Sequence, residues 1–185
     1  MGRKKRIWEP DAFYHIVCRG NRRELLFYDR EDFLVYLYIL EKVYQQYPFE
    51  IAAYCLMSNH IHLQLRSQEI PISKIMALIN KRHANYFNSK HNFTGHVYEK
   101  RFFDKVLRTP EDMIEVSRYI HLNPVEAKMV GAPEKYRWSS FRYYRNHQLR
   151  VPPYMNLEVL MDSYAMVEGE IKIDYRESLV NKGLL

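Results

Sequence analysis

Two histidines, His60 and His62, lie two residues apart in a run where polar and aliphatic residues alternate strictly. Ile61, Leu63 and Leu65 occupy the intervening positions. This alternation predicts a half-buried β-strand, because successive side chains of a strand point to opposite faces. Both imidazoles would lie on the polar face, roughly 6–7 Å apart at Cα, which is close enough for one divalent metal ion. A histidine pair alone is weak evidence for a metal site, since most such pairs are ordinary surface residues.

A second stretch, about 60 residues downstream, places a tyrosine on a helix. Thr109, followed by Pro110 and two acidic residues, predicts the start of that helix. Tyr119 lies off its apolar stripe, and Asn123 follows one turn later on roughly the same face. Pro124 disfavours helical backbone at Asn123. Asn123 is therefore either a functional amide or the cap of a second short helix over residues 124–129.

These residue types fit the chemistry of phosphodiester cleavage. Two neutral imidazoles and one amide or carboxylate oxygen suit a divalent ion with open coordination positions, and such an ion can polarise a phosphodiester. A tyrosine near the bound phosphate can attack phosphorus and form a covalent phosphotyrosine. Because that link conserves the bond energy, a free DNA hydroxyl can later reverse it without ATP. The chain supplies a two-histidine strand, a tyrosine on a helix and a basic, aromatic surface.

The composition limits the class of protein. The chain has 185 residues, enough for one domain or one domain with an appendage. Its 28 lysines and arginines exceed its 22 acidic residues, so we expect an anionic partner, most commonly nucleic acid. We find no run of 18 apolar residues and no apolar signal core, and expect a cytoplasmic protein without a membrane-spanning helix. Cys18 and Cys55 are expected to be reduced and buried.

Two basic segments are candidates for contact with nucleic acid. The first is an N-terminal arm that is either a solvated tail or a phosphate-binding segment, and it consists of Arg3, Lys4, Lys5 and Arg6. The second is a loop that either wraps an anionic backbone or is an ordinary charged turn, and it contains Arg19, Asn21, Arg22 and Arg23. Residues 136–145 interleave aromatics with arginines, which indicates either a packed helix or a base-stacking surface.

The surrounding pattern predicts the elements that position these residues. We expect helices over residues 30–46 and from Pro71 onward, and strands over residues 13–18, 49–56, 60–66 and 96–108, with a further extended run at 25–27. The order β-α-β-β-α-β predicts a ferredoxin-like (RRM-like) α+β fold, an antiparallel sheet with both helices on one face. The first and third strands would be central neighbours, with the metal pair on the open face. Residues 1–150 would form the main domain and 151–185 a C-terminal helical extension of uncertain role.

Several motifs, in order and spacing, resemble the REP-associated tyrosine transposases, which are relatives of the TnpA-like HUH transposases of insertion sequences. The resemblance covers about residues 10–145, and its motifs are residues 14–17, 19–23, 57–62, 95–101, 119–125 and 136–140. It implies cleavage and joining of single-stranded DNA at hairpin-flanked sites, with Mg or Mn as the cofactor. One departure is Glu126, an acid where the family often has a basic residue after the Asn-Pro-Val motif.

The resemblance also implies roles for individual residues. His60 and His62 match the metal pair of the family, and Tyr119 matches the position of its nucleophile. Asn123, one turn beyond Tyr119, is our candidate for the third metal ligand. Arg101 joins the basic residues expected to contact DNA. The remaining histidines, His15 among them, are interpreted as structural or surface residues.

Three hypotheses follow. The first is a metal-dependent endonuclease and strand transferase, a transposase, that acts on single-stranded hairpin DNA as a monomer or a homodimer. The second is a non-catalytic protein derived from a transposase that binds hairpin DNA or RNA. The third is a metal hydrolase that uses water, which would form no protein-linked DNA product.

Overall fold

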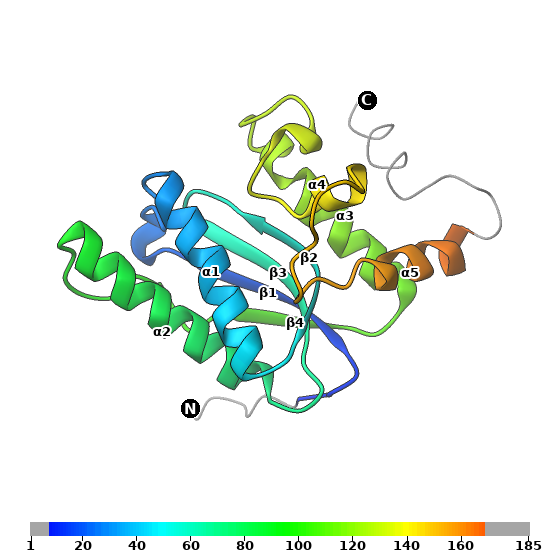
Figure 1. Ribbon diagram of the computed structural model, residues 1–185, viewed down its shortest axis with the longest axis horizontal. Helices are drawn as coiled ribbons and strands as arrows, with labels where there is room; N and C mark the ends of the chain where they lie inside the picture. The colour runs from blue at the N-terminus through cyan, green and yellow to red at the C-terminus, as the bar shows by residue number, and fades with distance from the viewer. Residues whose placement is uncertain (1–7, 169–185) are drawn as a thin grey trace.

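A four-stranded antiparallel sheet forms the centre of the computed structural model, which describes residues 8–168 (Figure 1). Its strands are β1 (Phe13–Arg19), β2 (Glu50–Leu56), β3 (His60–Arg66) and β4 (Phe103–Leu107). The strand order is β2-β3-β1-β4, and β2 and β3 form a hairpin. The first and third strands are therefore central neighbours, which confirms the ferredoxin-like prediction.

Two long helices, α1 (Arg30–Gln46) and α2 (Ile72–His91), cover one face of this sheet (Figure 1). α1 begins where the sequence predicts, because Asp29 and Asp32 form a capping box that satisfies the first backbone N–H groups. The aliphatic side chains of the alternating strand β3 are buried beneath the helices. Burial of each of these side chains contributes about 1.5–3 kcal/mol to folding. A shift of the strand register by one residue would move all of them to the other face of the sheet. This register directs the two histidines of β3 to the other face.

A third helix, α3 (Pro110–Glu126), packs on that other face of the sheet. Thr109 caps it as predicted, since its side chain accepts a hydrogen bond from the backbone N–H of Asp112. Met113 and Ile120 of α3 join a buried cluster with Cys55 of β2. The helix therefore covers part of the face on which the histidines lie.

α3 continues through Pro124, so the expectation of a second short helix capped by Asn123 is wrong. Pro124 lacks a backbone N–H, but it stands in the last turn, where one lost hydrogen bond is tolerated. Backbone bonding resumes at once, because the N–H of Ala127 donates to the carbonyl of Asn123 at 2.9 Å. The Asn123 side chain is thus free of a capping role.

One predicted extended run is wrong, and another is longer than the strand it contains. Residues 25–27 form no strand, and the N–H groups of Leu26 and Phe27 donate to the carbonyl of Ser58 in the β2–β3 turn. The run predicted over residues 96–108 is a strand only at residues 103–107. Its first part makes backbone hydrogen bonds to the last residue of β1 and to the loop that follows, such as the N–H of Glu99 donating to the carbonyl of Arg19 at 3.0 Å. Residues 25–27 and 96–102 therefore lie outside the four-stranded sheet.

After α3 the chain passes through the short helices η2 (Pro133–Lys135) and α4 (Phe141–Arg145). Tyr136, Phe141 and Tyr144 of the interleaved aromatic run are buried. The hydroxyl of Tyr144 donates to the carbonyl of Ala52 in β2 at 2.7 Å. For these residues the packed alternative is therefore correct, and the base-stacking alternative is not.

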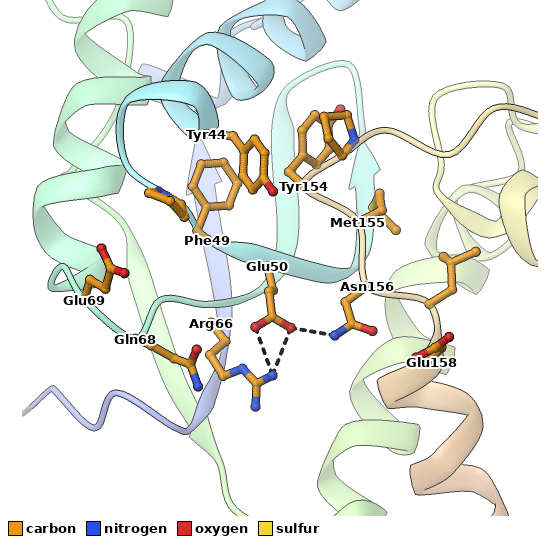
Figure 2. A pocket seen from close by; sticks show the side chains of 13 residues that line it. Tyr44, Phe49, Glu50, Arg66, Gln68, Glu69, Tyr154, Met155, Asn156 and Glu158 are labelled. Atoms are coloured by element: carbon orange, nitrogen blue, oxygen red, sulfur yellow. Dashed lines mark hydrogen bonds and ion pairs between the residues drawn. The ribbon is translucent and has the colours of Figure 1, made fainter.

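An extended segment at residues 154–156 then lies beside β2 (Figure 2). The N–H of Ile51 donates to the carbonyl of Tyr154 at 2.7 Å. The Glu50 carboxylate accepts from Arg66 at 2.9 Å and from the Asn156 amide at 2.6 Å, beside a pocket of about 560 Å³ (Figure 2). This pocket lies at the Arg66 end of β3, opposite to the end that bears His60.

The last described helix, α5 (Glu158–Glu168), packs against α3. Its residues Leu160 and Tyr164 are buried in the same cluster as α3. The described part of residues 151–185 thus belongs to the common core, and the domain division at residue 150 stays a prediction.

Other sequence expectations concern membranes and thiols. Within residues 8–168, no helix has the length and apolar character needed to cross a membrane. Cys18 and Cys55 are free thiols in the core, as expected. Burial raises the pKa of the Cys18 thiol to about 12, so this cysteine stays protonated and inert near neutral pH.

Candidate active site

His60 and His62 lie side by side on the face that bears α3, with ring centroids 4.9 Å apart and the ring planes at 87°. On the neighbouring strand β1, Arg19 is the register partner of His60, and Val17 is the partner of His62. Arg19 is exposed at one end of this face and His60 is partly buried, whereas His62 is only 3% exposed. The predicted open face is therefore open at one end and covered by α3 at the other.

Tyr119 reaches over the histidine pair from α3. Its ring meets the His62 ring edge to face, with centroids 5.3 Å apart and planes at 89°, and lies 5.9 Å from the ring of His15. Val116 and Ile120 are buried, which fixes the rotation of α3. Tyr119 consequently comes to the rim of the site and is 42% exposed. A substrate can reach its side chain while the ring still touches the histidines.

Asparagines face both ring nitrogens of His60. The Nδ2 of Asn59 donates to the carbonyl of Arg23 at 3.2 Å, which directs its Oδ1 to His60 Nδ1 at 2.7 Å. Since an amide oxygen only accepts, His60 Nδ1 carries the proton and Nε2 carries the lone pair. That lone pair faces the Oδ1 of Asn123 at 3.3 Å, a second acceptor. Two acceptors that face one another are an arrangement that suits a shared cation.

His62 is held by His15 of β1. The Nδ1 of His62 lies 3.1 Å from the Nε2 of His15, and the ring planes are only 20° apart with centroids separated by 5.3 Å. The rings therefore lie edge to edge and nearly coplanar, as an in-plane hydrogen bond requires. When Nδ1 of His62 donates to Nε2 of His15, the other nitrogen of the His62 ring, Nε2, carries a lone pair. This Nε2 is buried and has no hydrogen-bond partner among residues 8–168.

Burial keeps the three imidazoles neutral. It lowers the pKa of His62 to about 2, and the repulsion that a protonated His62 would meet from cationic neighbours, Arg19 among them, acts in the same direction. It lowers the pKa of His15 to about 4, assisted by the charge of Lys105. The pKa of His60 is also lowered, again mainly by burial. Neutral imidazole is the form that binds metal ions, so the site is prepared for a cation rather than a proton.

The donor atoms fit a divalent ion held by two histidines and an amide. The Nε2 of His60 faces an acceptor, and the Nε2 of His62 is unpartnered, so neither lone pair is used by the protein part that the structure describes. In that part, no group of three or more His, Cys, Asp or Glu side chains could hold a metal ion. The Oδ1 of Asn123, which lies 3.3 Å from Nε2 of His60, stays the predicted third ligand.

The basic loop after β1 is fixed beside His60. It contains the short turn η1 (Asn21–Arg23), and the N–H of Gly20 donates to the carbonyl of Asn59 at 2.9 Å. A Cβ at Gly20 would lie 2.0 Å from the carbonyl oxygen of Glu24, so only glycine fits there. Exposed arginines lie at this end of the site, Arg22 and Arg23 on the loop and Arg19 at the end of β1.

Arg101 joins the same basic surface. The N–H of Asn21 donates to the carbonyl of Val97 at 2.9 Å, which ties the loop to the segment that carries Arg101. Between this segment and α2 lies a pocket of about 480 Å³ whose lining includes Asn21, Lys81, His96, Lys100 and Arg101. Of the predicted nucleic-acid contacts, Asn21 and Arg101 therefore line one pocket. Arg3, Lys4, Lys5 and Arg6 lie outside the described residues.

Sequence reasoning missed two residues that orient the histidine pair, His15 and Asn59. His15, which the sequence interpretation left as structural or surface, contacts both His62 and Tyr119. The alternation of β1 places His15 on one face, but only the pairing of β1 with β3 brings that face to His62. Asn59 directly precedes the histidine motif, and its spacing alone could have identified it.

The fold and the site define an α+β protein with a histidine pair and a helical tyrosine on one face of a ferredoxin-like sheet. The model of the family described as "Transposase IS200 like" matches residues 10–123, and the chain belongs to this family. This finding confirms the family that the sequence motifs indicated.

A Haemophilus influenzae protein named as a candidate REP-associated tyrosine transposase is 28% identical over 109 residues, which are 52% of this chain and 61% of that protein. The match thus spans less than two thirds of the relative. A solved structure is described as a REP-associated tyrosine transposase bound to a REP hairpin. Its sequence is 20% identical to this chain, and the two structures superpose with a TM-score of 0.68. The match covers 82% of this chain and 89% of the chain in that structure. At this identity the likeness establishes the shared fold.

Proposed function

We propose that this protein is a metal-dependent endonuclease and strand transferase that cuts single-stranded DNA at hairpin sites through a covalent phosphotyrosine at Tyr119. The observation that carries the proposal is the contact between the rings of Tyr119 and His62, whose centroids are 5.3 Å apart. A tyrosine at the rim of a neutral histidine pair can meet a phosphate that the pair helps to hold.

In the proposed reaction the Oη of Tyr119 attacks phosphorus, so that one oxygen–phosphorus bond forms and one bond from phosphorus to a sugar oxygen breaks. The phenolic proton leaves to solvent, and the departing sugar oxygen gains a proton to become a hydroxyl. His60, His62 and Asn123 would hold Mg²⁺ or Mn²⁺. When bound, this ion supplies Lewis-acid polarisation of the phosphate. A free DNA hydroxyl that attacks the phosphotyrosine reverses the step and joins strands.

The basic surface beside His60 supports a DNA substrate. Arg22 and Arg23 are exposed on a fixed loop, and Arg19 is exposed at the end of β1 just before it. Arg101 lies on the segment that is hydrogen-bonded to that loop. Such cations bind phosphates without reading sequence. The related solved structure holds a REP hairpin, by its description, and we extend hairpin binding to this chain as part of the proposal. The protein would act as a monomer or a homodimer.

The test is incubation of labelled single-stranded hairpins from the source genome with Mn²⁺ or Mg²⁺, followed by a denaturing gel. We expect a slow-migrating protein–DNA band that disappears in Tyr119→Phe and with EDTA. Tyr38→Phe is the matched control, since Tyr38 is 57% exposed on α1 and outside the site. Cleavage without the band would indicate a hydrolase that uses water.

One observation favours a second candidate, a hairpin-binding protein that does not cut. The donor set offers a neutral amide where hard divalent ions prefer a carboxylate. Retained binding of the hairpins, with neither cleavage nor the covalent band, would support this candidate and reject the transferase.

A further inference from the structure

A row of side chains crosses the sheet from the histidine pair to the edge strand β4. Val17 of β1 is the register partner of His62 on one side and of Phe103 on the other. Register partners in antiparallel strands project from the same face. Phe103 therefore lies on the face of the candidate active site, two strand spacings or on the order of 10 Å from His62 at the backbone.

Phe103 is exposed, unlike the neighbouring aromatic residue. It is 52% exposed, whereas Phe102 is 3% exposed and belongs to the core under α1 and α2. α3 covers the same sheet face near Leu107, which is buried, but it does not cover Phe103. An aromatic ring thus stands uncovered on the part of the face that leads to Tyr119.

Cations flank this ring on the same face. Lys105 follows two residues later on β4 as the register partner of His15, and its side chain is 54% exposed. Arg19 is exposed two residues beyond Val17 on β1. Among residues 8–168, Lys105 forms an ion pair with Asp112, whose carboxylate lies 3.4 Å from the ammonium group. An aromatic ring between two cations complements a single nucleic-acid strand, whose bases stack and whose phosphates are negative.

We propose that Phe103 is a stacking platform for an unpaired base of the DNA strand that enters the active site. The base would belong to a nucleotide next to the phosphate held near Tyr119. Lys105 and Arg19 would contact the phosphates on either side. The inference rests on the proposed function, and it adds a subsite that recognises an unpaired nucleobase rather than the backbone.

The first experiment measures binding to two labelled probes in EDTA, so that no cleavage occurs. One probe is a short oligodeoxythymidine, and the other is an abasic oligomer of the same length and charge. Phe103→Ala should bind oligodeoxythymidine about tenfold more weakly or worse, because stacking on one aromatic side chain contributes that much per base. Its affinity for the abasic oligomer should be unchanged.

A second variant tests stacking directly. Phe103→Trp should restore the affinity for oligodeoxythymidine, and its added indole fluorescence should be quenched by that probe but not by the abasic oligomer. Phe103→Leu, which keeps an apolar side chain without a ring, should resemble Phe103→Ala. Tyr38→Ala is the matched control for loss of an exposed aromatic residue and should leave both affinities unchanged.

The salt dependence of binding distinguishes base stacking on Phe103 from the phosphate contact of Lys105. Lys105→Gln should reduce the log–log salt slope by about 0.7, the value for one phosphate contact on a single strand, while Phe103→Ala should leave the slope unchanged. Unchanged affinity of Phe103→Ala for oligodeoxythymidine would overturn the stacking proposal alone. A change of oligomeric state in Phe103→Ala without a change in DNA affinity would instead assign the ring to a protein contact. A wild-type protein that binds neither these probes nor hairpins would overturn the proposed function itself.

Discussion

Asn59 holds His60 in a single tautomer. Its Oδ1 lies 2.7 Å from Nδ1 of His60, and its Nδ2 is committed to the carbonyl of Arg23. The amide orientation is thus set by the basic loop, and the loop in turn determines which ring nitrogen of His60 presents a lone pair. Metal-binding histidines commonly depend on such a partner for ring orientation. The basic loop and the candidate metal site are therefore coupled through one side chain.

Replacing Asn59 should weaken metal binding. We expect Asn59→Ala to reduce Mn²⁺ affinity by roughly 10- to 100-fold, because His60 loses the acceptor that fixes its tautomer. Asn59→Asp keeps an acceptor oxygen and should restore most of the affinity. Titration calorimetry with Mn²⁺ in the absence of DNA measures both. Equal losses in the two variants would contradict the tautomer argument.

His15 should act on the site through His62. His15→Phe keeps a ring on the Tyr119 side but removes the nitrogen that lies 3.1 Å from Nδ1 of His62. We expect weaker Mn²⁺ binding and less covalent product, with partial rescue by His15→Gln, whose amide oxygen can accept the same hydrogen bond. Mn²⁺ titration and the denaturing gel provide the two readouts. His15→Phe with wild-type Mn²⁺ affinity would show that His62 needs no such partner.

Gly20 should be required for the basic loop but not for the fold. Because a Cβ at this position would lie 2.0 Å from the carbonyl of Glu24, Gly20→Ala should displace the turn that holds Arg22 and Arg23. We expect weaker hairpin binding and a smaller salt slope in a binding titration, with circular dichroism unchanged. Gly131→Ala is a matched control, since a Cβ at Gly131 meets nothing within 4 Å.

Asp32 should stabilise the protein at neutral pH. This buried carboxylate accepts hydrogen bonds from Tyr86 at 2.9 Å and from Lys90 at 3.0 Å, which join α1 to α2. Burial opposes its charge, but the backbone N–H of Tyr28 and these donors outweigh it and lower the pKa to about 2. We expect Asp32→Asn to reduce the free energy of unfolding by about 2 kcal/mol, because these donors lose a charged acceptor. Lys90 keeps its ion pair with Asp29, so the loss stays below that of a buried cation left without any partner.

The sign of the pH dependence follows from that pKa. An unfolded aspartate titrates near 3.9. The Asp32 contribution is therefore fully present above that value and is lost as the pH falls toward 2. Urea unfolding of wild type and Asp32→Asn at several pH values should show the two stabilities converging in acid. A difference that stays constant from pH 7 to low pH would contradict this account.

Two buried histidines should destabilise the fold at mildly acidic pH. Burial lowers the pKa of His83 to about 4 and that of His121 to about 3, whereas an unfolded histidine titrates near 6.5. Below about pH 6.5 these histidines are protonated in the unfolded chain but stay neutral in the folded chain. The free energy of unfolding therefore falls as the pH drops toward the two folded-state pKa values. Urea midpoints should decrease from pH 7 to pH 5, and a flat profile would be inconsistent with neutral buried rings.

Local patterns determined much of this protein. The alternation around His60 and His62 set the strand and the face of both histidines, because exposing the aliphatic residues between them would cost several kcal/mol. The cap at Thr109 and the apolar stripe of α3 set where that helix begins and how Tyr119 is turned. These features depend on residues within one or two turns of each other, so the sequence alone specifies them.

Tertiary structure decided the rest. His15 belongs to the site only because β1 pairs with β3 in one register, and Asn123 faces His60 only because α3 continues through Pro124 and packs on the histidine face of the sheet. The loop at Gly20 and the uncovered ring of Phe103 likewise depend on contacts between segments distant in sequence. No local periodicity encodes such contacts, because they follow from how several buried surfaces pack at once.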